Sequence, residues 1–169
     1  MPFINASGEL KTKPTQHSVK ELRSLGISPD VLVCRSEQEL PKDEKKKIAL
    51  FCSVPNESVI SMHDVDTVYS VPILLNKQKV DKTIIEKLKI KTKQPNLNDW
   101  KRVVKAKLMP EKEVNVSFVG KYTELKDSYK SINEALEHAG IKNKAKVNIN
   151  FVEAENISSK NIKKTLKNA

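Results

Sequence analysis

Apolar side chains in the first thirty residues repeat with the spacing of a helix. Val19, Leu22 and Leu25 recur at three-residue steps, which places them on one helical face. Thr15 is a residue type that caps helix N-termini, and Gly26 is the type that most often follows a last turn. We therefore predict a helix that begins after Thr15 and ends before Gly26.

Two short continuous apolar runs follow, over Val31–Cys34 and Ser58–Met62. Runs of this length are typical of strands, and the first is expected to be buried on both faces of a parallel sheet. Between the runs, Pro41 suits the first turn of a helix and Pro55 stops it. That helix is expected to bury the apolar side chains of Ile48, Ala49, Phe51 and Cys52. The order helix, strand, helix, strand predicts a layered α/β domain.

The chain becomes polar after a further helical face formed by Val80, Ile84 and Leu88. Lys and Pro residues are frequent in the next segment, and we expect an interdomain linker over residues 91–112. Apolar residues recur there with helical spacing, at Leu97, Trp100, Val104 and Leu108. A helix is therefore expected inside the linker.

The pattern of strand and helix restarts in the last third of the chain. Apolar and polar residues alternate in two stretches, with apolar positions at Val114, Val116, Phe118, Val147, Ile149 and Phe151. Gly120 is expected to end the first of these strands, a helical stripe from Leu125 to Gly140 follows, and a short helix closes the sequence. We therefore divide the chain into residues 1–90, the linker, and residues 113–169, both domains being α/β with parallel strands.

Length and composition exclude several classes of protein. The chain has 169 residues, and its apolar runs are far shorter than the roughly 20 residues that span a bilayer. The N-terminus has neither a basic start nor a long apolar core, so we predict no secretory signal, no membrane partner and a cytoplasmic location. Cys34 and Cys52 lie in separate apolar runs, which favours buried thiols over a disulfide or a metal site.

The formal net charge of +10, from 31 basic and 21 acidic residues, suggests nucleic-acid binding at first sight. Two details argue against it. Only Arg23, Arg35 and Arg102 are Arg, whereas base recognition depends on the Arg fork. Aromatic residues make up 5% of the chain and are not interleaved with the basic ones. We expect no nucleic-acid partner, and a small Lys-rich nucleic-acid-binding or assembly protein stays the alternative.

The strongest chemical candidate from the residues alone is the basic segment Lys11–Gln16. If the chain is extended up to Pro14, alternation places Lys11 and Lys13 on the same face, beside the start of the following helix. Free N–H groups at that start, together with the Thr15 hydroxyl, favour an anion, so the segment predicts a polyphosphate site. A solvated basic loop explains the same spacing, and both readings stay open on these grounds.

Polar side chains also follow the two expected strands of the first domain. Arg35 comes directly after the first run, and His63, Asp64 and Val65 come after the second. Open parallel sheets bind ligands beyond the carboxyl ends of their strands, so main-chain groups of the second segment are placed to hold a nucleobase edge. An ordinary loop histidine is the alternative for His63. The Lys45–Lys47 run is most simply a solvated helix face.

These blocks together resemble the cytidine triphosphate (CTP) synthase family. The Lys11–Gln16 run is the most specific part, and other blocks accompany it in order along essentially the whole chain. In the first domain they are Ser7–Glu9, His17–Leu22, Cys34–Ser36, Lys47–Cys52, Val54–Pro55, Val59–Ser61, Asp64–Asp66, Tyr69 and Val71–Pro72. Those that resemble the start of the family's glutaminase domain are Val119–Tyr122, Asp127, Tyr129–Ser131 and Glu134–Leu136.

The resemblance implies a ligase that makes CTP from uridine triphosphate (UTP) in pyrimidine biosynthesis. In the family, an amidoligase uses ATP and Mg²⁺ to phosphorylate the uracil 4-oxygen, and ammonia that a glutaminase releases from glutamine displaces this phosphate. UTP and CTP binding is implied for Lys11, Thr12, Lys13, Pro14, Thr15, Gln16 and Lys47. ATP binding is implied for Arg35, His63, Asp64 and Val65. Because the family's pyrimidine-nucleotide sites form between subunits, a homotetramer is expected.

The resemblance also implies parts that have no counterpart in this sequence. A phosphate-binding glycine loop and the magnesium carboxylates are absent, and neither cysteine has the flanking glycines of a nucleophile elbow. We therefore expect the end of a P-loop-type amidoligase domain, the linker helix, and the first βαβα of a flavodoxin-like glutaminase domain. No catalytic residue and no metal ligand is expected within this piece, which is predicted to be inactive alone.

Overall fold

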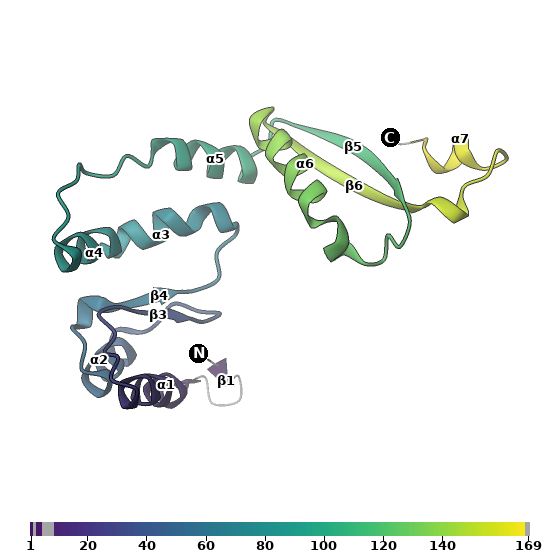
Figure 1. Cartoon of the computed structure of the whole chain (residues 1–169). Coiled ribbons are helices and arrows are strands. Elements are labelled where there is room, and N and C mark those ends of the chain that lie inside the picture. The colour runs from purple at the N-terminus through teal and green to yellow at the C-terminus, as the bar shows by residue number, and fades with distance from the viewer. Residues whose placement is uncertain (2, 5–8, 168–169) are drawn as a thin grey trace. The chain divides into compact units, whose positions relative to one another are not determined.

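The computed structural model describes residues 1, 3–4 and 9–167, and the chain divides into two compact units, Met1–Trp100 and Lys101–Ala169. Each unit contains helices and a pair of parallel strands, so the α/β class is confirmed at that level (Figure 1). Ser7 and Gly8, which belong to one of the quoted motifs, lie outside the described residues.

The first unit contains a small parallel sheet. Its elements are β1 (Phe3–Ile4), β2 (Glu9–Leu10), α1 (Lys13–Ser24), β3 (Leu32–Arg35), α2 (Lys42–Cys52), η1 (Asn56–Ser58), β4 (Val59–Met62), η2 (Val68–Ser70), α3 (Val71–Lys77) and α4 (Val80–Leu88). Strands β3 and β4 pair in parallel, with Leu32 opposite Val59 and Arg35 opposite Met62. This pairing confirms the parallel arrangement predicted from the two apolar runs. The short strands β1 and β2 pair antiparallel.

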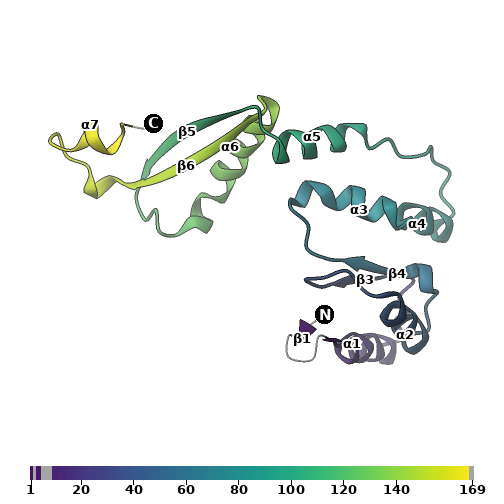
Figure 2. The same cartoon turned by 180° about the vertical axis from the view of Figure 1, so that it is seen from behind.

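Helices cover β4 on both sides. Helix α2 packs against it from one face and α3 from the other (Figures 1 and 2). Val59, Ile60 and Ser61 are therefore buried, whereas Val33 in β3 is 54% exposed. The prediction that the first strand is buried on both faces is wrong. Among the described elements, both covering helices pack on β4, and the side chain of Val33 on β3 is left open to solvent.

The core of the first unit lies where α1, α2 and the two parallel strands meet. It consists of Val19, Cys34, Leu40, Ile48, Ala49, Cys52, Val54 and Val59. Both thiols are buried, as the sequence predicts. Burying a large apolar side chain contributes about 1.5–3 kcal/mol, so this cluster is the main source of stability that the first unit shows.

Helix α1 begins earlier than its apolar pattern predicts. Its first residue is Lys13, Thr12 takes the capping position, and Thr15 lies inside the first turn. The prediction that Thr15 caps the helix is therefore wrong. Pro14 is compatible with the earlier start. Proline has no backbone N–H, and the N–H groups in the first turn of a helix have no acceptor within the helix, so no helical hydrogen bond is lost. Gly26, with φ +82°, follows the end of the helix as predicted.

The bounds of α2 and α4 agree more closely with the pattern. Helix α2 starts directly after Pro41 and ends at Cys52, where Ser53 takes a left-handed conformation with φ 54°. The helix thus ends before Pro55 is reached. The predicted face at Val80 lies on α4, where Val80 is buried but Leu88 is exposed.

Helix α5 (Asn98–Leu108) is the helix expected in the polar segment between the domains. The boundary between the two compact units falls within it, after Trp100. The finer division into residues 1–90, 91–112 and 113–169 stays a prediction.

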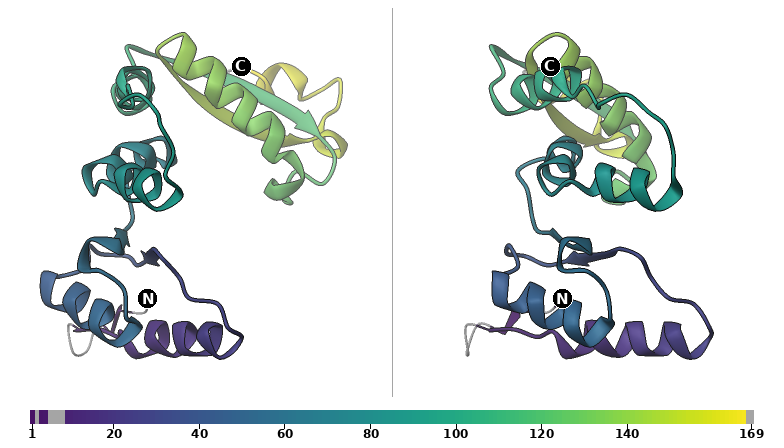
Figure 3. Two further views of the ribbon diagram at one scale, coloured as in Figure 1. Left: turned by 60° about the vertical axis from the view of Figure 1, so that its left-hand side comes forward. Right: turned by 90° about the vertical axis from the view of Figure 1, so that its left-hand side faces the viewer.

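The second unit is a longer parallel pair with a crossover helix. Its elements are β5 (Lys112–Gly120), η3 (Lys126–Tyr129), α6 (Lys130–Lys142), β6 (Ala145–Glu153), η4 (Ala154–Asn156) and α7 (Ile162–Thr165). Strands β5 and β6 pair from Lys112 opposite Ala145 to Gly120 opposite Glu153. Helix α6 lies along one face of this sheet (Figure 3). The two predicted strands and the helix between them are confirmed.

Two predicted details of the second unit are wrong. Leu125 precedes α6 and η3, and Gly140 lies within α6, which continues to Lys142. A Cβ at Gly140 would lie 2.6 Å from the Ala145 carbonyl oxygen and 2.9 Å from a methyl carbon of Val147. This glycine is therefore explained by the close approach of helix and strand, and not by a helix stop.

Candidate functional site

The segment Lys11–Gln16 leads into α1. Extended structure ends at Leu10, and the helix already includes Lys13. The prediction that Lys11 and Lys13 share one face of an extended strand is therefore wrong. The first turn of the helix, and not strand alternation, determines where the polar groups of this segment lie.

Thr12 and Gln16 hold that first turn together. The Gln16 backbone N–H donates to the Thr12 carbonyl oxygen, and the Gln16 side-chain amide donates to Thr12 Oγ1, both at 3.1 Å. Thr12 is 3% exposed, so it supports the backbone from inside. Lys13 and Pro14 are exposed, and Thr15 is half-buried. The turn thus presents the Lys13 ammonium group to solvent on a rigid base.

An open hollow of about 460 Å³ lies along α1 beside α2. It is lined by Lys13, Gln16, His17, Val19, Lys20, Arg23 and Phe51. Acidic side chains are absent from this lining, and His17 Nε2 lies 4.0 Å from a carboxylate oxygen of Glu21 outside it. Lys13 and Lys20 form no hydrogen bond or ion pair with another described residue. The hollow therefore favours a ligand that carries several negative charges.

Phe51 is the part of this hollow that the sequence pattern misses. The spacing of α2 predicts a buried Phe51, but its side chain is 63% exposed and lines the hollow. An exposed aromatic ring beside cations is suited to stacking on a planar group. Lys20 and Arg23 are missed as well, although Lys20 follows Gln16 by four residues and Arg23 follows Lys20 by three, which is a signal in the sequence.

Lys47 lies on α2, one helical turn before Phe51. Its ammonium group is 3.9 Å from a Glu44 carboxylate oxygen, and its side chain is 46% exposed. Lys47 does not line the hollow. Residues four apart share a helix face, so Lys47 and Phe51 lie on the same side of α2. Lys47 therefore lies on the same face of α2 as Phe51 but outside the lining of the hollow.

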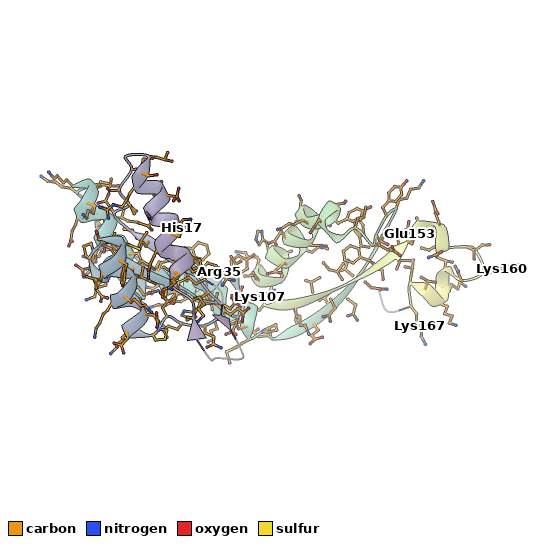
Figure 4. All side chains as sticks on the ribbon, turned by 90° about the horizontal axis from the view of Figure 1, so that it is seen from below. His17, Arg35, Lys107, Glu153, Lys160 and Lys167 are labelled. Carbon is orange, nitrogen blue, oxygen red and sulfur yellow. The ribbon has the colours of Figure 1, made fainter. Side chains whose placement is uncertain are left out.

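A second group of candidate residues lies at the carboxyl ends of β3 and β4. The Arg35 guanidinium forms an ion pair with Asp64 and donates to the Ser36 carbonyl oxygen at 2.6 Å. The Asp64 backbone N–H donates to the Glu37 carbonyl oxygen at 3.4 Å. Arg35, labelled in Figure 4 together with His17 of the hollow, is thus joined to the loop that follows the neighbouring strand. Parallel pairing brings these two segments together, as expected.

His63 and Val65 flank Asp64 in the same loop. The His63 ring is half-buried, and its Nδ1 lies 3.4 Å from Ser61 Oγ. Val65 is half-buried too, whereas Asp64 is exposed. The residues on both sides of the exposed Asp64 are therefore held by the fold. A solvated loop would not be held in this way.

The cysteines are not placed as nucleophiles. Burial raises the pKa of the Cys34 thiol, and the neighbouring Cys52 raises it further. Burial likewise raises the pKa of the Cys52 thiol, against the opposing charge of Arg23. Because the thiolate is the reactive form, both groups are held in the unreactive state at neutral pH.

The described residues contain neither a metal-binding cluster nor a membrane-spanning helix. In that part of the chain, no three His, Cys, Asp or Glu side chains lie close enough to hold a metal ion. The residues present therefore do not fit a Mg²⁺ site. None of the described helices combines the length and apolar character needed to cross a bilayer.

In the second unit, Glu153 lies at the carboxyl end of β6 (Figure 4). Its carboxylate accepts from the Thr123 N–H at 2.9 Å, from Thr123 Oγ1 at 3.0 Å and from the Tyr122 N–H at 3.1 Å. These hydrogen bonds hold the pKa of Glu153 below its usual value, and the bond from the Thr123 backbone N–H has the largest effect. Glu153 thereby fixes the loop after β5, where Tyr122 has φ 56°.

Parallel strand pairs with crossover helices, a cationic hollow and polar residues at strand ends are the features of an α/β protein that binds phosphate-bearing ligands. Known proteins narrow this class to one family. A family model described as CTP synthase N-terminus matches residues 1–90. The chain therefore belongs to the CTP synthase family, as its motifs predict.

Two relatives show how much of the family's length is represented. The chain is 52% identical over 169 residues to a CTP synthase of Pelagibacter ubique (strain HTCC1062), which covers 99% of this chain and 31% of the relative. It is 51% identical over 162 residues to a CTP synthase of Hydrogenobaculum sp. (strain Y04AAS1), covering 96% of this chain and 30% of the relative. The chain thus spans about three-tenths of the length of the curated relatives it matches.

Proposed function

We propose that the protein carrying this chain is a CTP synthase, a ligase of pyrimidine nucleotide biosynthesis. It uses ATP to phosphorylate the uracil 4-oxygen of UTP, and ammonia released from glutamine then displaces the phosphate to form CTP. The observation that carries this proposal is the 52% identity to a CTP synthase across 99% of the chain. A small Lys-rich nucleic-acid-binding or assembly protein is not favoured, because the family match accounts for the same basic residues.

Within that protein, the first turn of α1 and the hollow beside it bind the triphosphate of UTP or CTP. The residues of this site are Lys11, Thr12, Lys13, Pro14, Thr15, Gln16 and Lys47. The cationic lining of the hollow, without an acidic member, supports this assignment. A hydrogen bond from an ammonium group to a phosphate oxygen is worth about 1.5–3 kcal/mol. Phe51, exposed in the same hollow, is placed to contact a planar ring.

Arg35, His63, Asp64 and Val65 contact ATP, with the adenine edge held by main-chain groups of the last three residues. Support comes from their common position at the carboxyl ends of β3 and β4, where parallel sheets bind ligands. The ion pair with Asp64 restrains the Arg35 guanidinium, so that less rotational freedom is lost when ATP binds.

This chain contributes nucleotide binding, whereas catalysis requires other parts of the protein. The first unit is the end of a P-loop-type amidoligase domain, and the second is the first βαβα of a flavodoxin-like glutaminase domain. Mg²⁺ ligands and the glutaminase nucleophile come from outside the described residues, which offer no metal-binding group. The active protein is a cytoplasmic homotetramer. The isolated chain forms no CTP, and its synthesis by this chain alone would contradict that division of labour.

The decisive experiment places this chain in a relative. The 169 residues replace the aligned segment of the Pelagibacter ubique protein, and CTP formation from UTP, ATP and Mg²⁺ is measured with glutamine and, separately, with ammonia. The chimera is expected to form CTP from both nitrogen donors. Activity with ammonia alone would show that the ligase half works and that glutamine hydrolysis or ammonia transfer is impaired. A folded chimera that forms no CTP from either donor would overturn the proposal.

A further inference from the structure

The Gln78 side chain joins β4 to α2, the two elements next to the candidate residues, and no motif in the sequence marks it. Gln78 follows the last turn of α3, and its amide lies against β4. Its Oε1 accepts from the Ser61 backbone N–H at 2.9 Å, and its Nε2 donates to the Ser61 carbonyl oxygen at 2.8 Å. The amide thus pairs with both polar groups of one residue, as a neighbouring strand would.

A second element is tied to the same amide. Lys45 on α2 donates from Nζ to Gln78 Oε1 at 3.1 Å, and Gln78 Nε2 also points at the Leu74 carbonyl oxygen at 3.5 Å. An amide oxygen has two acceptor sites and an amide nitrogen two donors, so the Gln78 side chain has a partner for each. Because both Ser61 N–H and Lys45 Nζ are donors, only one orientation of the amide fits.

Gln78 contacts the carboxyl end of β4 through the backbone of Ser61. Ser61 is fully buried, so its backbone groups require partners. Its Oγ accepts from the Leu40 N–H at 2.9 Å and lies 3.4 Å from His63 Nδ1. Ser61 therefore connects Gln78 to the loop that holds His63 and Asp64, two and three residues later in the chain.

We propose that Gln78 is a positioning residue for nucleotide binding: through Ser61 it holds the His63–Val65 loop in place, and through Lys45 it ties that strand end to the helix that carries Lys47. The nucleotide part of this inference rests on the function proposed above. Two strong bonds go to Ser61 and one goes to Lys45, so loss of Gln78 affects ATP more than UTP.

Four variants separate this role from a general loss of stability. Gln78→Met keeps the length of the side chain and removes its hydrogen bonds. Gln78→Glu keeps the two acceptor bonds but replaces the donor to the Ser61 carbonyl oxygen with a second acceptor, so it tests the donor half of the pair. Lys45→Met removes only the bond to α2. Gln94→Met is the matched control, because Gln94 is exposed and forms no hydrogen bond with a described residue.

Two readouts are made on the chimera described above. The first is amide hydrogen exchange of the peptide over residues 61–66, which does not depend on activity. The second is the KM for ATP and for UTP at fixed enzyme concentration, with thermal unfolding recorded for each variant. Gln78→Met is expected to accelerate exchange in this peptide and to raise the KM for ATP about five- to tenfold, from the loss of one or two net hydrogen bonds.

The other variants define the expected pattern. Gln78→Glu is expected to accelerate exchange over residues 61–66 at least as much as Gln78→Met, because two acceptor oxygens then face each other at Ser61. Lys45→Met leaves exchange over these residues near the wild-type rate, and Gln94→Met changes neither readout. Unchanged exchange in Gln78→Met would overturn the inference. Faster exchange with equal effects on both KM values would overturn the link to ATP. A wild-type chimera without CTP formation would instead overturn the proposed function, while exchange would still decide whether Gln78 holds the strand end.

Discussion

The two units of this chain use parallel strands in different ways. Strands β3 and β4 are each four residues long, yet Val59, Ile60 and Ser61 in β4 are buried. Strands β5 and β6 are each nine residues long, yet Ala145 and Val152 are the buried residues among them. A longer ladder of hydrogen bonds therefore does not by itself produce a larger core.

The residue patterns of the strands explain this difference. The β4 sequence is nearly continuous in apolar character, and helices pack against both of its faces. Apolar residues alternate with Asn and Ser in β5 and β6, and α6 lies along one face. Phe118 and Phe151 from the two strands meet Tyr129 there, with ring centroids 5.5 Å apart for the two Phe rings and 4.7 Å for Phe118 and Tyr129. The apolar β4 strand is thus covered on both faces and the alternating strands β5 and β6 on one. The apolar run in β3, where Val33 is 54% exposed, shows that such a run does not by itself secure cover on both faces.

The largest expected effect tests this contrast with the same substitution in both units. Ile48 is fully buried, so Ile48→Ala is expected to lower the free energy of unfolding of the first unit by about 2–5 kcal/mol. Ile149 on β6 is half-buried, and Ile149→Ala should cost the second unit about 1–2 kcal/mol.

Thiol labelling in denaturant measures this effect in the first unit alone, because both cysteines of the chain are buried there. Hydrogen exchange of β5 and β6 follows the second unit. Equal losses from the two substitutions would contradict the contrast in burial.

A second prediction tests whether the first unit binds the pyrimidine nucleotide through the start of α1. Lys13→Ala in the chimera is expected to weaken UTP and CTP binding about 10- to 100-fold, because a charged hydrogen bond to phosphate is lost. ATP affinity and stability should stay near wild type. The matched control is Lys82→Ala on α4, where the lysine is exposed. Equal UTP affinity in Lys13→Ala and wild type, measured by equilibrium binding, would remove Lys13 from the site.

The third prediction concerns helix–strand contact in the second unit. Gly140→Ala places a Cβ 2.6 Å from the Ala145 carbonyl oxygen, a backbone atom that cannot move freely. Displacing α6 from β6 is expected to cost about 1–3 kcal/mol, as overpacking does in other cores. Ser131→Ala, at an exposed position on the same helix, is the control. If Gly140→Ala were as stable as this control, the glycine would have no packing role.

The smallest effect is a pH dependence confined to the loop after β5. The pKa of Glu153 is lowered in the folded state, so its bonds contribute stability at pH values above the usual carboxyl pKa. That contribution is lost as the pH falls through the lowered value. Amide exchange of Tyr122 and Thr123 should therefore accelerate in acid, after correction for the intrinsic rate. Glu153→Gln should abolish this extra acceleration, and Glu124→Gln, at an exposed neighbour, should retain it.

The sequence by itself determined the order of the larger helices and strands apart from α3, the two parallel pairs and the burial of both thiols, whereas the short strands β1 and β2 were not predicted. Apolar spacing is a local property, and it predicts the elements around Val19, Val59 and Val116 without knowledge of their neighbours. The motif Lys11–Gln16 and the blocks after it were sufficient to identify the family, because residue identity in order does not depend on the fold.

Only the tertiary structure decided which side chains face one another. The capping position at Thr12, the exposure of Phe51 and the contact of Gly140 with Ala145 are fixed by the packed structure and not by apolar spacing. The bonds of Gln78 to Ser61 and Lys45 join positions 17 and 33 residues apart. Periodicity assigns a residue to a face, but the partner on that face is set by packing between elements, which no local pattern contains.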